Sequence, residues 1–194
     1  QFVQDFIHSY SKSAVDFPTR LISEIAPSVS DIALRTLGES RMNSILETNS
    51  FPPNSKDSIA LDCVLLLLAL FEVNDKKKEP SRLKHVFIRF ENAHAAGTAL
   101  SHVKGQGINQ PVIVSYGSVT DKFVIAMEGR DSTVDGSFAD ALLAYLSSFW
   151  IFKLELATPV KSEVSLLANL AGANISLSGE AARLYRKISG THHK

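Results

Sequence analysis

The segment EGRDSTVDG, residues 128–136, is a polar stretch at the carboxyl end of a predicted strand. It contains Glu128, Arg130, Asp131 and Asp135. Carboxylates in such a position can bind a divalent cation or act as general acid and base, so a small-molecule enzyme that uses the 128–135 loop is one hypothesis. However, the spacing of a calcium-binding loop is absent and an arginine lies in the middle. An ordinary charged connection is therefore the favoured interpretation.

Other patterns typical of catalysis or metal binding are missing from the sequence. No G-x-S-x-G motif occurs, and Cys63 lies inside an apolar run, where we expect a core thiol. His94 and His102 are eight residues apart on one predicted helix, about 12 Å along its axis, which is too far for one metal ion. The glycines of GQGINQ, residues 105–110, precede a strand and do not fit a phosphate-binding loop. We therefore expect no enzyme, no cofactor and no metal.

Two basic segments suit contact with nucleic acid. One is the lysine-rich stretch after the apolar run, and the other lies near the end of the chain. Together they supply a candidate basic patch of Lys76, Lys77, Lys78, Arg82, Lys84, Arg183, Arg186 and Lys187. The whole chain has 20 basic and 20 acidic residues, so no global positive field attracts phosphates. A solvated linker explains the lysines equally well, and nucleic-acid binding is the second choice.

A third group of residues suits contact with another protein. The predicted helix that ends in SSFWIFKLEL holds more aromatic residues than one helix face can bury. Aromatic residues often anchor protein interfaces. We therefore predict an interface, in its simplest form a homodimer, at Tyr145, Phe149, Trp150 and Phe152. The alternative is a larger core that buries all four side chains.

The element that anchors these segments is the most hydrophobic stretch of the chain, from Ile59 to Phe71. A transmembrane helix needs about 20 apolar residues. This run has 13 residues and includes Asp62, so we expect no membrane span. Instead it predicts a central helix, capped by Ser55 or Asp57 and enclosed by other elements.

The order of the remaining elements predicts an α+β fold with a mainly helical amino-terminal half, a small β-α-β-β-α unit and carboxyl-terminal helices. We expect one domain, residues 1–194, or two sub-lobes, 1–75 and 81–194, joined by a linker at 74–80. The expected helices before the central one are 1–15, 17–27 and 28–49, the last weakened by Gly38. The later elements are strand 83–90, helix 91–107, a hairpin of strands 110–117 and 122–129, and helices 134–152, 160–172 and 180–189.

The same order of strands and helices also occurs in ferredoxin-like RNA-recognition modules. Their aromatic signature is absent here, and the fourth strand would have to come from FKLELA, residues 152–157. Phe87, Phe90 and Phe123 are therefore expected in the core rather than on an RNA-binding surface.

The series QPVIVSYG, KFVIAMEG and a helix ending in FWIFKLEL resembles the carboxyl-terminal region of a broad family of uncharacterised animal proteins. The resemblance covers residues 60–170, and the chain departs from the pattern after Phe152, where it lacks a Tyr-Pro pair. It implies a shared fold and no activity. Some members lie in transposon-derived or zinc-finger-bearing proteins, which implies a nuclear setting.

These observations predict a non-enzymatic module for protein interaction or oligomerisation. Hydrophobic residues make up 45% of the chain and charged residues 21%, as in ordinary globular proteins. A single cysteine favours a reducing, intracellular setting, with the nucleus and the cytoplasm both open.

Overall fold

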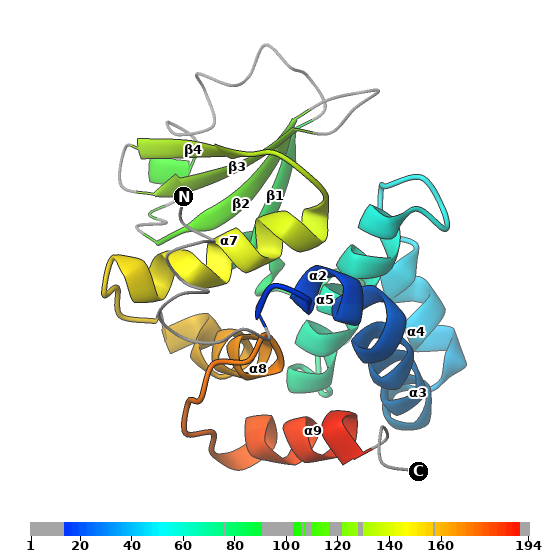
Figure 1. Ribbon diagram of the computed structural model, residues 1–194. Coiled ribbons are helices and arrows are strands. Elements are labelled where there is room, and N and C mark those ends of the chain that lie inside the picture. The colour runs from blue at the N-terminus through cyan, green and yellow to red at the C-terminus, as the bar shows by residue number, and fades with distance from the viewer. Residues whose placement is uncertain are drawn as a thin grey trace.

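A mixed four-stranded sheet and a set of helices stacked below it make up the fold (Figure 1). The predicted α+β class is confirmed. The computed structural model describes residues 14–75, 77–90, 103–105, 107, 110–116, 122–127, 130–156 and 158–190. The helix predicted at 1–15 and most of the helix predicted at 91–107 lie outside these residues, although 103–105 are helical.

The sheet contains β1 (Phe87–Phe90), β2 (Val112–Tyr116), β3 (Lys122–Met127) and β4 (Arg130–Val134), in that spatial order. β1 runs parallel to β2, and the other neighbours are antiparallel. The predicted hairpin is confirmed, because β2 pairs with β3 from Val112 opposite Ala126 to Tyr116 opposite Lys122.

The prediction of a polar loop at 128–135 is wrong, because residues 130–134 form the edge strand β4. An edge strand needs few apolar side chains of its own, and here only Val134 packs against the main core. The ferredoxin-like alternative also fails. That fold places its first and third strands side by side in the centre of the sheet, whereas β1 lies at an edge next to β2.

The two faces of the sheet take alternate side chains of each strand. One face contributes Phe87, Ile113, Phe123 and Ile125 to the main core. Phe51 and Phe138 join Phe87 and Phe123 there, with ring centroids 5.1–6.1 Å apart. The opposite face holds a smaller cluster of Val103, Val112, Val114, Tyr116 and Ala126.

The apolar run forms the central helix α5 (Lys56–Phe71), as predicted. The Ser55 hydroxyl accepts a hydrogen bond from the Ser58 backbone N–H at 3.0 Å, so Ser55 is the cap. Every residue from Cys63 to Leu70 is buried. Among the described residues, no helix combines the length and apolar character that crossing a membrane requires.

The helices that precede α5 differ from the prediction at Pro27. α2 (Phe17–Arg20), the π-helical turn η2 (Leu21–Ile25) and α3 (Ala26–Leu37) form one helical run that continues through this proline. The Ala26 N–H donates to the carbonyl oxygen of Leu21, five residues back. This wider turn accommodates the ring and the missing N–H of Pro27.

The predicted weak point at Gly38 does separate α3 from α4 (Glu39–Leu46). Its φ of 80° lies in the region that glycine adopts most readily. From α4, the Arg41 guanidinium donates to the backbone oxygens of Glu72, Val73 and Asp75 at the end of α5. A cation at this position also suits the helix dipole. The amino-terminal part of the 74–80 linker is therefore tied to α4.

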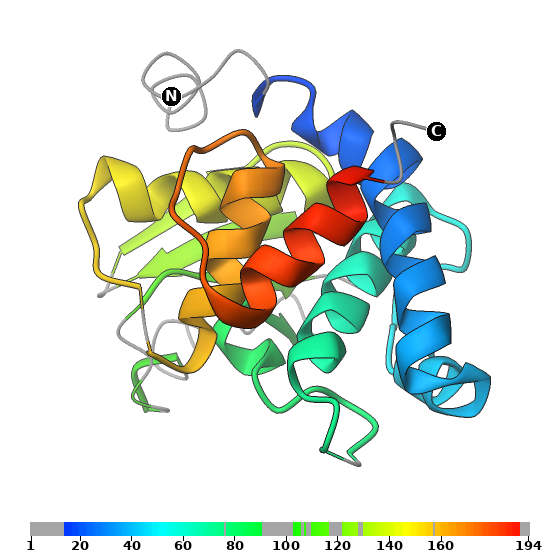
Figure 2. The ribbon, with the colours of Figure 1, turned by 90° about the horizontal axis from the view of Figure 1, so that it is seen from below.

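The carboxyl-terminal helices α7 (Phe138–Ile151), α8 (Lys161–Leu170) and α9 (Gly179–Gly190) follow below the sheet as successive layers (Figure 1). Short 3-10 turns, η3 (Leu83–His85) and η5 (Thr158–Val160), precede β1 and α8. Seen from below, α9 lies across α8 and reaches towards α3 (Figure 2).

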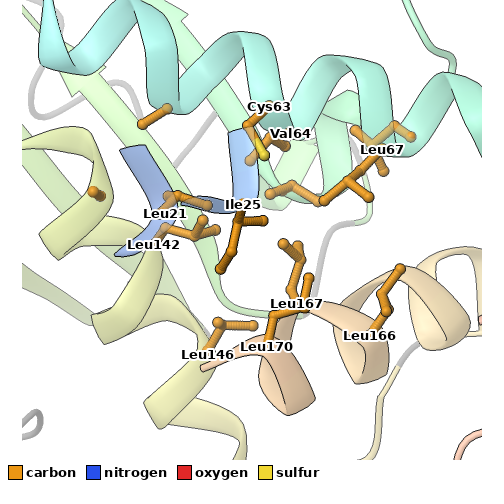
Figure 3. Close-up of a cluster of buried hydrophobic side chains, with 14 of the residues drawn as sticks. Leu21, Ile25, Cys63, Val64, Leu67, Leu142, Leu146, Leu166, Leu167 and Leu170 are labelled. Atoms are coloured by element: carbon orange, nitrogen blue, oxygen red, sulfur yellow. The ribbon is translucent and has the colours of Figure 1, made fainter. Parts of the chain in front are cut away.

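One main cluster of buried hydrophobic residues extends from Ala14 to Ile188. In its centre, side chains of the first helical run, α5, α7 and α8 point towards one another (Figure 3). Figure 3 labels Leu21, Ile25, Cys63, Val64, Leu67, Leu142, Leu146, Leu166, Leu167 and Leu170. The residues before and after the 74–80 linker thus contribute to the same core.

Candidate functional site

The amino end of α7 is fixed by two independent hydrogen-bonded contacts. Ser137 and Asp140 form a capping box, in which the Ser137 N–H donates to Asp140 Oδ2 at 2.8 Å. From the first turn of α5, Asp57 Oδ1 accepts a bond from the Phe138 N–H at 2.7 Å. Gly136, with φ 134°, leaves room for the capping carboxylate, since a Cβ there would lie 2.6 Å from Asp140 Oδ2. These contacts set the direction in which α7 presents its aromatic residues.

Two of the four aromatic residues predicted at an interface lie in the core instead. Tyr145 is fully buried and Phe149 is 3% exposed. Their rings meet edge to face at 5.2 Å, and the Tyr145 hydroxyl donates to the His85 carbonyl oxygen at 3.3 Å. Burial, aided by the Glu163 charge, raises the pKa of Tyr145. The prediction is wrong for these two side chains, because α7 packs between the sheet and α8.

The other two aromatic residues lie where α7 ends. Trp150 is half-buried, and Phe152 is 39% exposed. The Lys153 N–H donates to the Trp150 carbonyl oxygen at 3.2 Å, and the Leu154 N–H donates to that of Phe149 at 2.8 Å. With Lys153 at φ 51°, this is a Schellman termination. The helix end is therefore held in one conformation.

Beyond the termination, apolar and charged side chains alternate. Leu154 and Leu156 are half-buried and pack against the main core, whereas Lys153 and Glu155 are exposed. We call residues 150–156 the helix-end surface. It carries the exposed Phe152 side chain and the opposite charges of Lys153 and Glu155. Leu154 and Leu156 attach the segment to the main core.

Several members of the predicted basic patch already have carboxylate partners in the structure. Lys76 lies outside the described residues. Lys78 Nζ lies 3.7 Å from the Glu47 carboxylate, and Arg183 pairs with Glu180. Two of the predicted cations are therefore already matched by carboxylates on the surface, which weakens the case for a phosphate-binding face.

Arg82, a third member of that patch, lies between two buried carboxylates. Its guanidinium pairs with Glu163, which is 2% exposed, and its Nε lies 3.3 Å from the Glu72 carboxylate, which is 7% exposed. The Ser81 N–H and hydroxyl both donate to Glu72 at 3.0 Å. Since buried carboxylates need such partners, Arg82 has a structural role that its place in a lysine-rich segment did not reveal.

Arg82 and Lys187 line the same groove, so the two basic segments do meet. The groove has a volume of about 520 Å³ and lies between the end of α5 and α9. Glu72, Asp75 and Glu180 line it as well. Three acidic residues against two basic ones make this groove unsuited to a polyanion.

A second pocket, of about 460 Å³, is lined by residues of α5 and β1. Lys77 and Lys84 of the predicted patch line it together with Arg89, which the sequence interpretation missed. Arg89 belongs to a predicted strand, and nothing in the local pattern shows that the strand edge faces the lysine-rich segment. Only the packing of β1 beside α5 reveals this basic pocket.

The structure describes only some of the residues considered for catalysis or metal binding. Asp131 lies on β4 and is exposed, as is Asp135, while Glu128, His94 and His102 lie outside the described residues. Within the described ranges, no group of three or more His, Cys, Asp or Glu side chains is placed to hold a metal ion. Cys63 is buried, and burial raises the pKa of its thiol, which disfavours the nucleophilic thiolate.

The comparisons with known proteins add no relative. No family model, curated protein or solved structure matches this chain significantly. The family resemblance inferred from the sequence therefore stays a prediction.

Proposed function

We propose that this chain is a non-enzymatic, intracellular protein-interaction module that self-associates through the helix-end surface, residues 150–156. The observation that carries the proposal is the exposure of Phe152, 39%, beside half-buried Trp150 at the end of a helix whose other aromatic residues are buried. Aromatic side chains are enriched at protein interfaces, where they often anchor binding.

The charges on this surface favour a second copy of the chain as the partner. Lys153 and Glu155 are exposed on either side of Leu154. In a two-fold interface, any contact between residue i of one copy and residue j of the other occurs twice, so we expect Lys153 of each copy to pair with Glu155 of the other. Two such pairs would flank the Phe152 side chains.

The rigidity of the segment also supports the proposal. The Schellman bonds hold the helix end, and Leu154 and Leu156 pack against the main core. A surface that is already ordered loses little conformational entropy when it binds. Because seven residues form only a small contact, we expect a weak dimer with Kd of about 1–100 μM.

Replacement of Phe152 tests this interface directly. We expect Phe152→Glu to abolish concentration-dependent dimerisation in sedimentation velocity, because a charge would replace the central apolar contact. The matched control is Leu34→Glu, which places the same charge at another exposed apolar residue, 46% exposed on α3. It should dimerise like the wild type. Circular dichroism of both variants checks that the fold is intact.

Charge reversal separates a two-fold interface from other contacts. Lys153→Glu and Glu155→Lys should each weaken the dimer, because like charges then face each other. An equimolar mixture of the two variants should dimerise again, because opposite charges face each other in the mixed dimer. A wild type that stays monomeric up to 1 mM (roughly the weak limit of specific association), or a dimer indifferent to Phe152→Glu, contradicts the proposal.

A further inference from the structure

The basic pocket between α5 and β1 has an apolar floor. Leu61 and Leu65 of α5, Leu83 of η3 and Phe87 of β1 are among its lining residues, and each is at most 7% exposed. Its volume of about 460 Å³ lies within the range of about 300–1,000 Å³ that is typical of small-molecule sites. A ligand in this pocket therefore meets apolar as well as charged side chains.

The walls of the same pocket are predominantly positive. Lys77, Lys84 and Arg89 line it, and Glu79 is the one acidic residue among the lining residues that the structure describes. Lys77 and Lys84 are exposed, so their ammonium groups can reach the entrance. Hydroxyl groups of Thr48, Ser50 and Ser81 also line the pocket, and each already takes part in a hydrogen bond within the protein.

Arg89 is held in place before any ligand arrives. Its Nη1 donates to the Ser50 hydroxyl, and its guanidinium carbon lies 4.7 Å from the centre of the Phe51 ring. A cation stacked on an aromatic ring keeps a fixed orientation. The guanidinium is thus held in a fixed position at the wall of the pocket.

From these contacts we infer that the basic pocket binds a small anionic amphiphile, an aliphatic carboxylate. The hydrocarbon chain would lie against Leu61, Leu65 and Leu83, and the carboxylate would lie among Lys77, Lys84 and Arg89. Neither half of such a ligand suffices alone. The leucines favour the chain through loss of water from apolar surface, and the cations favour the head group through charge.

The charges that line this pocket favour an anion more than those of the groove beside Arg82 do. The groove has three acidic lining residues and its arginine is already paired with Glu72 and Glu163. Within the described residues, no carboxylate lies in ion-pair distance of Lys77 or Lys84. Binding of an anion to either lysine therefore breaks no ion pair with a described carboxylate.

Calorimetric titration of the full chain with three probes tests the inference. We expect decanoate to bind in a 1:1 complex, whereas decan-1-ol, which lacks the charge, and acetate, which lacks the chain, bind at least tenfold more weakly. Raising the salt concentration should weaken decanoate binding, since the contact at the entrance is exposed to solvent. Equal affinity for decanoate and decan-1-ol, or no saturable binding of decanoate, overturns the inference.

Variants identify the pocket and separate it from the proposed interface. Lys84→Ala should lower decanoate affinity about two- to fivefold, the size expected for an exposed ion pair, and Lys77→Glu/Lys84→Glu should lower it further. Lys187→Ala, an exposed lysine on α9, is the matched control and should bind like the wild type. Phe152→Glu should also bind decanoate normally, so failure of dimerisation and failure of ligand binding are distinguishable. Normal binding by the double variant overturns the assignment to this pocket.

Discussion

Asp62 is the single charged residue between Ile59 and Phe71, and it is half-buried on α5. The Asn49 side-chain amide donates to Asp62 Oδ1 at 2.7 Å and also to the backbone oxygen of Ser58 at 2.9 Å. Burial raises the pKa of the Asp62 carboxyl, and the bond from Asn49 opposes that rise only in part. The ionised form therefore opposes folding.

This imbalance predicts that Asp62→Asn stabilises the protein at neutral pH. Below the ordinary pKa of 3.8, Asp62 is protonated in both the folded and the unfolded state. As pH rises through the higher folded pKa, the wild type loses stability, because the unfolded state ionises more readily. Asparagine keeps the acceptor for Asn49 and removes the ionisation. Urea unfolding from pH 3 to pH 7 should show a gain for the variant that grows with pH, and a gain independent of pH would contradict the prediction.

At the scale of elements, Asp57 joins two helix starts that are far apart in the sequence. It lies in the first turn of α5, where a negative charge suits the helix dipole, and it accepts a bond from the first N–H of α7. The amino ends of these helices meet at one carboxylate. α7 is the layer between the sheet and α8, so its position affects the whole stack.

Asp57→Ala should therefore lower the free energy of unfolding by about 1–2 kcal/mol, the usual effect of losing a helix cap. Asp57→Asn, which retains an acceptor, should recover part of the loss. The matched control is Asp135→Ala, which removes an exposed acid three residues before α7 and should change stability by less than about 0.5 kcal/mol. Chemical denaturation followed by circular dichroism measures all three. Equal effects of Asp57→Ala and Asp135→Ala would contradict the capping role.

At the scale of the whole molecule, Arg82 links segments on both sides of the linker. It pairs with Glu72 at the carboxyl end of α5 and with Glu163 on α8. The main core likewise draws on both parts. We therefore expect the chain to unfold in one transition, with coincident curves from the fluorescence of the single tryptophan, Trp150, and from far-ultraviolet circular dichroism.

Arg82→Ala should shift both curves together and destabilise the protein by about 3 kcal/mol, because it leaves the buried Glu163 carboxylate without its ion-pair partner. The control Arg183→Ala removes an exposed ion pair with Glu180 and should cost less than about 1 kcal/mol. Two separate transitions, or an Arg82→Ala effect as small as that of the control, would contradict this interpretation.

The sequence by itself determined the elements whose signals are local. The apolar run predicts α5 with Ser55 or Asp57 as its cap, the two β-branched stretches predict the β2–β3 hairpin, and the pattern over 134–152 predicts α7. Each signal lies within about ten residues, so neighbouring side chains decide it. The presence of aromatic residues at the end of α7 was predictable for the same reason.

Only the tertiary structure decided the features that depend on distant partners. β4 is a strand because β3 supplies its hydrogen bonds, and Tyr145 and Phe149 are buried because the sheet and α8 cover α7. The ion pair of Arg82 with Glu163 and the place of Arg89 in the basic pocket likewise depend on residues that are distant in the sequence. Pairing and burial are settled by residues far away along the chain, and a local pattern holds no information about which segments will meet.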